Sequence, residues 1–324
     1  MTQFSSRNGI CFQWRTQDYW QGGDEAAHIQ TQYNTIIQHF RVIHGYQLCG
    51  WDNGQYKDLE LPGAGTLLRL AHQTNKTGPT IPVEIVQGTL NGVFDNFSSH
   101  PEYAMNWANT LWATAFNKDT ELAKQTVKAI VLGNEIDMVG MVNHDPQKLK
   151  ETILNLYKGL DTVGLGSIPI TSTFANIGSA KYPNPVAQAL VQTIYDNWQQ
   201  GWNNKTPFVF ANHYTAGFTS TDPKTATGYI EDARSYYTTT LKMPKLKIYV
   251  GEMGYSADDG AQKQAIVDNA FFAWTATQET GAPVCVFQAY DQPKVGSARD
   301  KQYGVFQTGN NKPKLGIQLP KLSA

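Results

Sequence analysis

The chain has 324 residues, a length that suits one large α/β domain better than several small ones. Hydrophobic residues make up 41% of it and charged residues 16%, which excludes an intrinsically disordered protein. The net charge is −1 and no run of Lys and Arg forms a basic stripe, so no nucleic-acid partner is expected. No apolar run reaches the ~18–20 residues of a membrane span, and residues 1–7 lack the layout of a signal peptide.

Short segments rich in β-branched and aromatic residues alternate along the chain with longer amphipathic segments. We expect eight strands, at residues 9–14, 39–44, 82–88, 128–133, 167–173, 207–214, 247–252 and 283–290. We expect helices between them, at residues 24–38, 65–73, 102–116, 146–160, 185–199, 223–241 and 261–277. Asp145-Pro146 and Asp222-Pro223 each place a capping side chain before a proline suited to the first helical position. An eighth helix is poorly marked, and residues 312–319 are expected to form an extended segment that closes the domain.

This order of elements predicts the α/β class and a single (β/α)8 barrel over residues 1–324. A doubly wound open sheet is the alternative, but it normally carries a glycine-rich phosphate-binding loop after its first strand. Here that turn is Trp14-Arg15-Thr16-Gln17-Asp18, without a glycine, so the barrel is favoured.

Polar residues at the carboxyl ends of the predicted strands are the candidates for an active site, because (β/α)8 enzymes build it there. The fourth strand ends in Asn134-Glu135 and the seventh in Gly251-Glu252. These strands lie across the barrel from each other, and two carboxylates facing each other over an aromatic-lined cleft suit glycoside hydrolysis. One carboxyl must hold a proton for the leaving oxygen, and the other must be ionised to attack the anomeric carbon. Taken singly, each glutamate is more commonly a helix cap or an ion-pair partner.

Five segments, in the same order along the chain, resemble motifs of glycoside hydrolase family 17. They are Phe40-Arg41-Val42, Val131-Leu132-Gly133-Asn134-Glu135, Gly251-Glu252-Met253-Gly254-Tyr255, Phe287-Gln288-Ala289-Tyr290-Asp291-Gln292-Pro293, and Tyr303-Gly304-Val305-Phe306 followed by Lys312-Pro313-Lys314. The chain departs from the family pattern at Met253, Ser256 and Gln292. The short stretch between the sixth and seventh strands is similar to the microbial branch, which lacks the extra subdomain of plant members.

The resemblance implies a retaining β-1,3-glucanase or β-1,3-glucanosyltransferase that needs no cofactor. Glu135 would be the general acid and then base, and Glu252 the nucleophile, with carboxyl groups roughly 5–5.5 Å apart. Asn134 would bind the sugar 2-hydroxyl, Tyr214 would donate to Glu252, and Arg41 would stabilise that charge from below. The other residues expected to contact substrate are Tyr46, Tyr255, Tyr290 and Asp291.

Two other functions stay open from the sequence. A barrel that binds β-glucan without cleaving it would use the acids only as sugar contacts. A metal-dependent barrel hydrolase would gather Glu135, Asp137, His213 and Glu252 around an ion, but no HxH or HExxH spacing supports this, so no metal is expected.

Compartment and assembly are weakly marked in the sequence. Cys11, Cys49 and Cys285 are too few for a disulfide scaffold, and we interpret them as buried thiols, with one disulfide as the alternative. The expected partner is a β-glucan chain and the expected state a monomer. The expected activity favours a secreted or cell-wall location, although no signal peptide is seen in the chain.

Overall fold

One parallel sheet organises the molecule in the computed structural model, which describes residues 4–13, 25–52, 55–60, 62–138, 145–198, 206–215, 220–292 and 299–322. Its strand order is β7-β6-β5-β2-β1-β11-β10-β9-β8. The strands are β1 (Asn8–Cys11), β2 (Val42–Gly45), β5 (Glu84–Gly88), β6 (Val127–Val131), β7 (Ile170–Thr171), β8 (Thr173–Phe174), β9 (Phe208–Asn212), β10 (Lys247–Met253) and β11 (Val284–Val286).

The sheet closes on itself through β7 and β8, which are consecutive pieces of one strand. β7 pairs with β6 and β8 pairs with β9, so the two pieces join the ends of the sheet into a barrel of eight parallel strands. All eight predicted strands overlap observed ones, and the predicted (β/α)8 barrel is confirmed.

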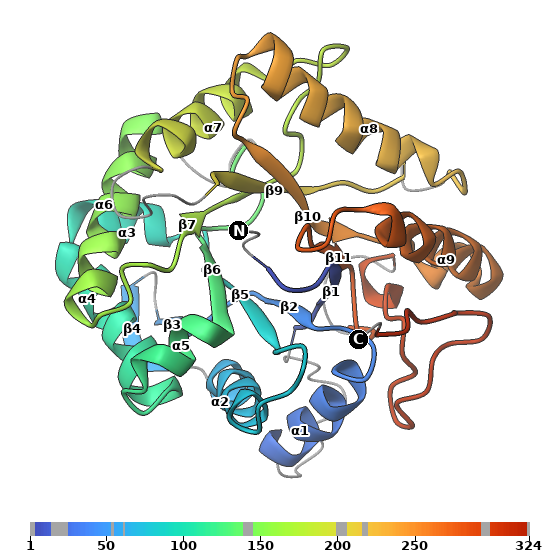
Figure 1. The fold of residues 1–324 in the computed structure, drawn as a ribbon, viewed down its shortest axis with the longest axis horizontal. Helices are drawn as coiled ribbons and strands as arrows, with labels where there is room; N and C mark the ends of the chain where they lie inside the picture. Colours follow the sequence, from blue (N-terminus) through green and yellow to red (C-terminus); the bar gives the residue numbers. More distant parts are fainter. Residues whose placement is uncertain are drawn as a thin grey trace.

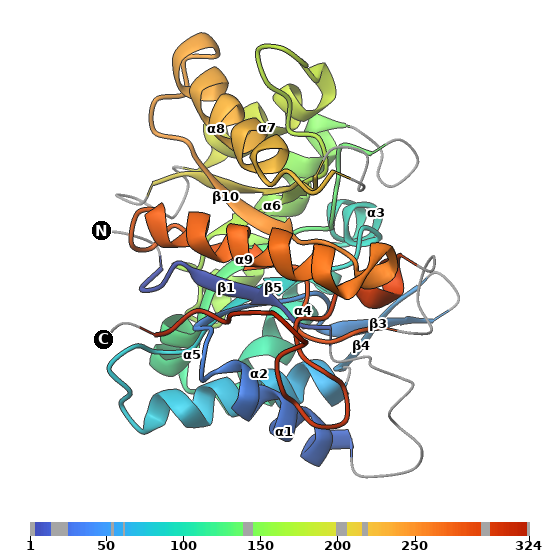
Figure 2. The same cartoon turned by 90° about the vertical axis from the view of Figure 1, so that its right-hand side faces the viewer.

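Helices surround the strands as an outer ring (Figure 1), and Figure 2 shows α9 lying along one side of the barrel. They are α1 (Glu25–Ile36), α2 (Pro62–Lys76), α3 (Val93–Ser99), α4 (Pro101–Asn109), α5 (Thr120–Thr126), α6 (Pro146–Thr162), α7 (Pro185–Asn197), α8 (Lys224–Ser235) and α9 (Ala261–Thr277). Their starts follow from local chemistry. Asp145 accepts a hydrogen bond from the Gln147 N–H at 2.8 Å, and Pro146 takes the first helical position.

The sequence missed one hairpin and two short helices. A hairpin of β3 (Cys49–Asp52) and β4 (Gln55–Glu60) follows β2, and its signal is the Asn53-Gly54 pair typical of tight hairpin turns. The short helices α3 and α5 were not expected either, because each has too few residues to show a helical period. After β11 the described residues contain a 3-10 turn, Asp300–Gln302, where the eighth helix of the fold would stand.

Aromatic side chains fill the amino end of the barrel. Phe4 packs edge-on against Phe208, Phe210 and Tyr249, with ring centroids 5.9, 6.4 and 5.8 Å apart. The N–H of Ser5 donates to both carboxylate oxygens of Glu84, at 3.0 and 2.9 Å. The N-terminal segment therefore covers this end of the barrel, where Glu84 is buried beneath it. None of the helices in the described ranges is long and apolar enough to cross a membrane.

Candidate active site

Glu252 lies inside β10, and its side chain reaches the interior of the barrel near the carboxyl end. It is 4% exposed. Its Oε1 accepts hydrogen bonds from the Tyr46 hydroxyl at 2.7 Å and from Asn134 Nδ2 at 3.4 Å. Its Oε2 accepts from the Tyr214 hydroxyl at 2.7 Å. Three donors from the ends of β2, β6 and β9 therefore converge on one buried carboxylate.

Two side-chain amides connect Glu252 to Glu135. Asn212 Nδ2 lies 3.0 Å from Asn134 Oδ1 and 3.3 Å from Glu135 Oε1, so it can donate to both. The Thr173 hydroxyl also donates to Asn134 Oδ1, at 2.7 Å. With its acceptor oxygen engaged, Asn134 must present Nδ2 to Glu252. The two carboxylates thus belong to one hydrogen-bonded network across the barrel mouth.

The turn after β6 has an unusual backbone that aims Glu135 into this network. Gly133 has φ of +66°, and a Cβ atom at this position would overlap Asn91 Oδ1. Glu135 itself has φ of +54°, which is rare for a residue with a side chain. The Asn134 N–H donates to Asn91 Oδ1 at 2.7 Å, and the Glu135 N–H donates to Thr173 Oγ1 at 3.0 Å. Such backbone conformations are concentrated at functional sites.

Both carboxyl groups have raised pKa values. Burial raises the pKa of Glu252 first, and the nearby charge of Glu135 raises it further. Burial likewise raises the pKa of Glu135, with a contribution from Asp137. Donors favour the ionised form, and Glu252 receives three of them whereas Glu135 receives one. Hydrogen bonding therefore favours the ionised form of Glu252 more than that of Glu135, whereas the deeper burial of Glu252 acts in the opposite direction.

The tyrosines that contact Glu252 stay protonated. Burial raises the pKa of Tyr46 and of Tyr214 well above the usual value, and the charge of Glu252 acts in the same direction. The ring of Tyr214 is fixed edge-on between Phe287 and Tyr303, with centroid distances of 6.1 and 5.6 Å. Both hydroxyls are therefore positioned donors at neutral pH.

Three of the other predicted substrate residues serve the packing of the chain. Tyr255 is 1% exposed and donates its hydroxyl to Asp259 at 2.9 Å. Tyr290 is 2% exposed and donates to Asn311 Oδ1 at 2.8 Å. Asp291 accepts from the Gly304 N–H and from Lys314 Nζ, both at 2.8 Å. Rings this deeply buried offer no free face to a sugar, and Asp291 anchors the C-terminal segment.

Arg41 lies at the end of the barrel opposite the carboxylate pair, so its expected effect on the charge of Glu252 would act along the length of the strand. The second strand begins after it, at Val42, and not at residue 39. Its N–H donates to Asn8 O and its carbonyl accepts from the Glu84 N–H, so it sits level with the first residues of β1 and β5. A full strand length therefore separates Arg41 from Tyr46.

Sequence reasoning also missed residues that belong to the network, chiefly Asn212, Thr173 and Asn91. A signal for Asn212 was present. Alternate residues of a strand point to the same side, so Asn212 and Tyr214 face the barrel interior together. His44 and Tyr46 at the end of β2 share the same spacing.

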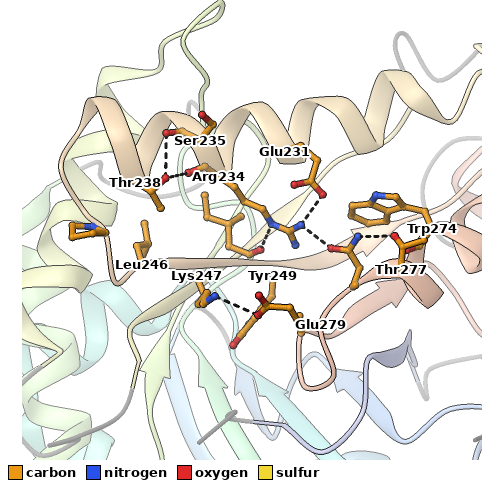
Figure 3. Close-up of a pocket in the computed structure, with 14 residues that line it drawn as sticks. Glu231, Arg234, Ser235, Thr238, Leu246, Lys247, Tyr249, Trp274, Thr277 and Glu279 are labelled. Atoms are coloured by element: carbon orange, nitrogen blue, oxygen red, sulfur yellow. Dashed lines mark hydrogen bonds and ion pairs between the residues drawn. The ribbon is translucent and has the colours of Figure 1, made fainter.

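A cavity of about 600 Å³ lies elsewhere, between α8, the start of β10 and the end of α9 (Figure 3). Its charged groups are already paired. Arg234 Nη1 lies 2.9 Å from Glu231 Oε1 and 2.7 Å from Gln278 Oε1, and Lys247 Nζ lies 3.3 Å from Glu279 Oε2. This cavity is at the amino end of β10 and is separate from the carboxylate pair.

Metal-ligating side chains do not cluster in the described part of the chain, where no three His, Cys, Asp or Glu residues are grouped as an ion would require. The carboxylates of the pair accept hydrogen bonds from amides and phenols instead. Cys11, Cys49 and Cys285 are buried free thiols.

Solved structures of glucan-cleaving enzymes share this fold. The β-1,3-glucanase and allergen CJP38 of Cryptomeria japonica pollen aligns with a TM-score of 0.69 at 14% identity, over 97% of this chain and 99% of that one. A plant β-glucan endohydrolase aligns at 0.65 and 14% identity, over 94% and 98% of the two chains. An endo-laminarinase from Formosa Hel1_33_131 aligns at 0.61 and 14% identity, over 100% and 97%. No protein-family model and no curated protein sequence matches the chain. At this level of identity, the similarity establishes the fold.

Proposed function

We propose that the protein is a retaining glycoside hydrolase or transglycosylase acting on β-1,3-glucan, with Glu252 as nucleophile and Glu135 as acid and base. The observation that carries the proposal is the single network in which Asn134 and Asn212 connect the two buried carboxyl groups. A pair of carboxyl groups whose protonation is split between two environments is what glycosidic bond cleavage requires.

In the first step, a Glu252 carboxylate oxygen attacks the anomeric carbon, and the bond from this carbon to the leaving oxygen breaks. Glu135 transfers its proton to that oxygen, so the departing chain leaves as a neutral alcohol. The product is a glycosyl ester on Glu252. Tyr46, Tyr214 and Asn134 hold the carboxylate before the attack, and their hydrogen bonds keep it ionised.

In the second step, Glu135 is a carboxylate and removes a proton from an incoming hydroxyl. The oxygen of that hydroxyl attacks the anomeric carbon, and Glu252 leaves with its electron pair restored. Water as the acceptor gives hydrolysis, and a sugar hydroxyl gives transfer. Two displacements retain the anomeric configuration in either case.

The glucan assignment draws on the solved relatives of the fold, which are described as β-1,3-glucanase, β-glucan endohydrolase and endo-laminarinase. It is supported by exposed apolar side chains on loops at the barrel mouth. Leu90, Met138 and Tyr182 follow β5, β6 and β8, and they are 37, 43 and 57% exposed. Apolar surfaces at this end suit the C–H faces of glucose rings better than the buried Tyr255 and Tyr290 do.

A series of reducing-end-labelled β-1,3-gluco-oligosaccharides tests the proposal. The wild type should give shorter labelled products, or longer ones if it transfers, and NMR of the first product should show the β-anomer. The Glu252→Ala variant should be inactive, and azide should restore cleavage of an activated aryl β-glucoside with formation of the α-glycosyl azide. A first product in the α-configuration, or full activity of the variant without azide, would contradict the assigned roles.

A further inference from the structure

The peptide bond before Glu252 lies at an irregular point of β10. The strand shifts register against β9 between Val250 and Glu252, and against β11 between Val250 and Met253. Gly251 is therefore paired with no residue of either neighbour. A Cβ atom on Gly251 would lie 2.5 Å from Asn212 Oδ1, so only glycine permits the close approach of the network here. Irregularities of this kind re-aim a side chain next to an active site.

Two buried side chains satisfy the carbonyl of Gly251. His44 Nδ1 lies 3.1 Å from this oxygen, and Cys11 Sγ lies 3.2 Å from it. A carbonyl only accepts, so Nδ1 must carry the imidazole proton and the thiol must donate as well. Buried carbonyls need such partners, because a buried acceptor without a hydrogen bond destabilises the folded state. His44 and Cys11 come from β2 and β1, so three strands meet at this one carbonyl.

The same imidazole also supports a donor to Glu252. The rings of His44 and Tyr46 are stacked, with centroids 4.8 Å apart and planes at 21°. Phe210 stacks near the imidazole as well, with centroids 6.1 Å apart. Tyr46 then donates its hydroxyl to Glu252 Oε1 at 2.7 Å. His44 therefore contacts both the backbone that carries Glu252 and the phenol that holds its carboxylate.

We propose that His44 is a positioning residue for Glu252, which fixes the nucleophile by donating to the Gly251 carbonyl and by holding the ring of Tyr46. The proposal rests on the function proposed above, since it assigns a supporting role to a residue of the same site. His44 touches no reacting atom, so its effect is on the geometry and basicity of the carboxylate.

The groups around the imidazole leave it neutral. The titratable side chains in contact with it are Cys11 of β1 and Tyr46 at the end of β2. Burial lowers the pKa of His44 to about 4, and burial raises the pKa of Cys11 well above its usual value. Replacing His44 by another neutral ring therefore changes no charge near Glu252 at neutral pH. A change in the pKa of Glu252 after such a replacement therefore reflects a change in the position of its hydrogen-bond donors.

Two variants of His44 separate its two contacts. His44→Phe keeps an aromatic ring beside Tyr46 and removes the donor to Gly251. His44→Asn keeps an amide N–H in the place of Nδ1–H and removes the stacked ring. His72→Phe is the matched control, because His72 is also buried, at 7% exposure, and packs on Phe116 outside the barrel. Kinetics on a β-1,3-gluco-oligosaccharide should give a kcat about 10- to 100-fold lower for both His44 variants, with KM within threefold of the wild type.

A second measurement needs no activity. Proteins with ¹³C-labelled glutamate carboxyl groups are titrated by NMR, and Glu252→Gln identifies the Glu252 signal. The pKa of Glu252 should be higher in His44→Phe than in the wild type, because its donors are less well held, and unchanged in His72→Phe. If His44→Phe does not fold, His44→Asn tests the ring contact with Tyr46 by the same titration, and an unchanged pKa of Glu252 in it would contradict that part of the positioning role.

The outcomes distinguish the two proposals. A wild type inactive on every β-glucan, with a shifted Glu252 titration in His44→Phe, would refute the proposed function and leave the positioning role standing. Wild-type kcat and an unchanged Glu252 titration in the His44 variants would overturn the positioning role and leave the proposed function intact.

Discussion

The barrel contains two buried glutamates at its opposite ends, Glu84 at the start of β5 and Glu252 near the end of β10. They are 1 and 4% exposed, and burial is the main cause of the raised pKa of each. Glu84 accepts two hydrogen bonds from the Ser5 N–H, and Lys128 Nζ lies 3.8 Å from it. The Ser5 N–H and Lys128 favour its ionised form and partly offset burial, and the contact with Ser5 attaches the N-terminal segment.

Glu252 has a different environment. In the described residues no Lys or Arg pairs with it, and its donors are two phenols and an amide. The nearby charge is a second carboxylate, Glu135, which opposes ionisation. A raised carboxyl pKa alone does not mark a catalytic group. The two glutamates differ in their neighbours. Those of Glu84 favour its ionised form, whereas Glu135 competes with Glu252 for a proton.

Removing each glutamate in turn should give the largest contrast. Glu252→Ala should lower kcat/KM on β-1,3-glucan by about 10⁴-fold or more, because no nucleophile remains. Glu84→Gln should stay within about twofold of wild-type activity, since its contacts are at the amino end of the barrel. Initial rates of reducing-sugar release measure both. Equal losses in the two variants would remove the distinction between the two ends.

The acid half of the pair is the next test. Glu135→Gln should lower kcat on natural glucan by about 10²–10⁴-fold, because the leaving oxygen receives no proton. On an aryl β-glucoside with a nitrophenolate leaving group, which departs without a proton, the loss in the first step should be much smaller. Burst kinetics with the two substrates separate the steps. The same loss on both would assign Glu135 to another role.

Removing one hydrogen-bond donor to Glu252 should have an intermediate effect on activity. Tyr214→Phe removes a hydrogen bond that favours the ionised carboxylate, so the pKa of Glu252 rises and the acid limb of the kcat/KM profile moves to higher pH. We expect a loss of about 10- to 100-fold at the optimum pH, from one charge-assisted hydrogen bond. Tyr303→Phe is the control, because it keeps the ring that packs on Tyr214. An acid limb moved to lower pH would contradict the assignment.

The pH dependence of stability tests whether the buried carboxyl group of Glu84 titrates. A carboxyl whose pKa is raised in the folded state stabilises the fold most below the unfolded pKa of about 4.5, and this stability is lost as pH rises through the folded pKa. The pKa of Glu84 is raised to about 7, so the loss falls between about pH 4.5 and 7. When the pH rises from 5 to 8, the free energy of unfolding should fall by about 1–3 kcal/mol more in the wild type than in Glu84→Gln. Urea unfolding at both values measures this, and an equal loss in both proteins would show that Glu84 does not titrate there.

The smallest effect is expected in the cavity of Figure 3, where Lys247 and Glu279 are exposed and form an ion pair. Glu279 is 75% exposed beside Lys247, so Glu279→Gln should change the free energy of unfolding by less than about 1 kcal/mol. Activity should be unchanged. Thermal unfolding at low and high salt measures the change in the free energy of unfolding. A large drop in glucan cleavage would show that this cavity takes part in the reaction.

Much of the site could be predicted from the sequence, because the carboxyl ends of the strands of a parallel barrel all lie at the same end of the barrel. Glu135, Asn134, Glu252 and Tyr214 each follow or end an apolar segment, and their strand positions alone predict that they converge. Arg41 entered the predicted site through the family resemblance, and the structure places its backbone level with the first residues of β1 and β5. Its expected effect on the charge of Glu252 stays a prediction.

The roles of the tyrosines needed the folded structure. Tyr46, Tyr255 and Tyr290 all lie near strand ends, yet only Tyr46 donates to the carboxylate pair. Local sequence has no signal for this difference, since aromatic rings fill cores and bind sugars with the same surfaces.

The sequence by itself determined the eight strands, their order and the two glutamates, because these depend on periodicity and on position along single segments. The tertiary structure decided which groups surround them. Asn212, His44 and Cys11 reach the site from three strands far apart in the chain, and their contacts depend on register and on the irregular pairing of Gly251. Such contacts arise only when the barrel closes, so a local pattern can indicate that Asn212 faces the interior but not which groups it contacts.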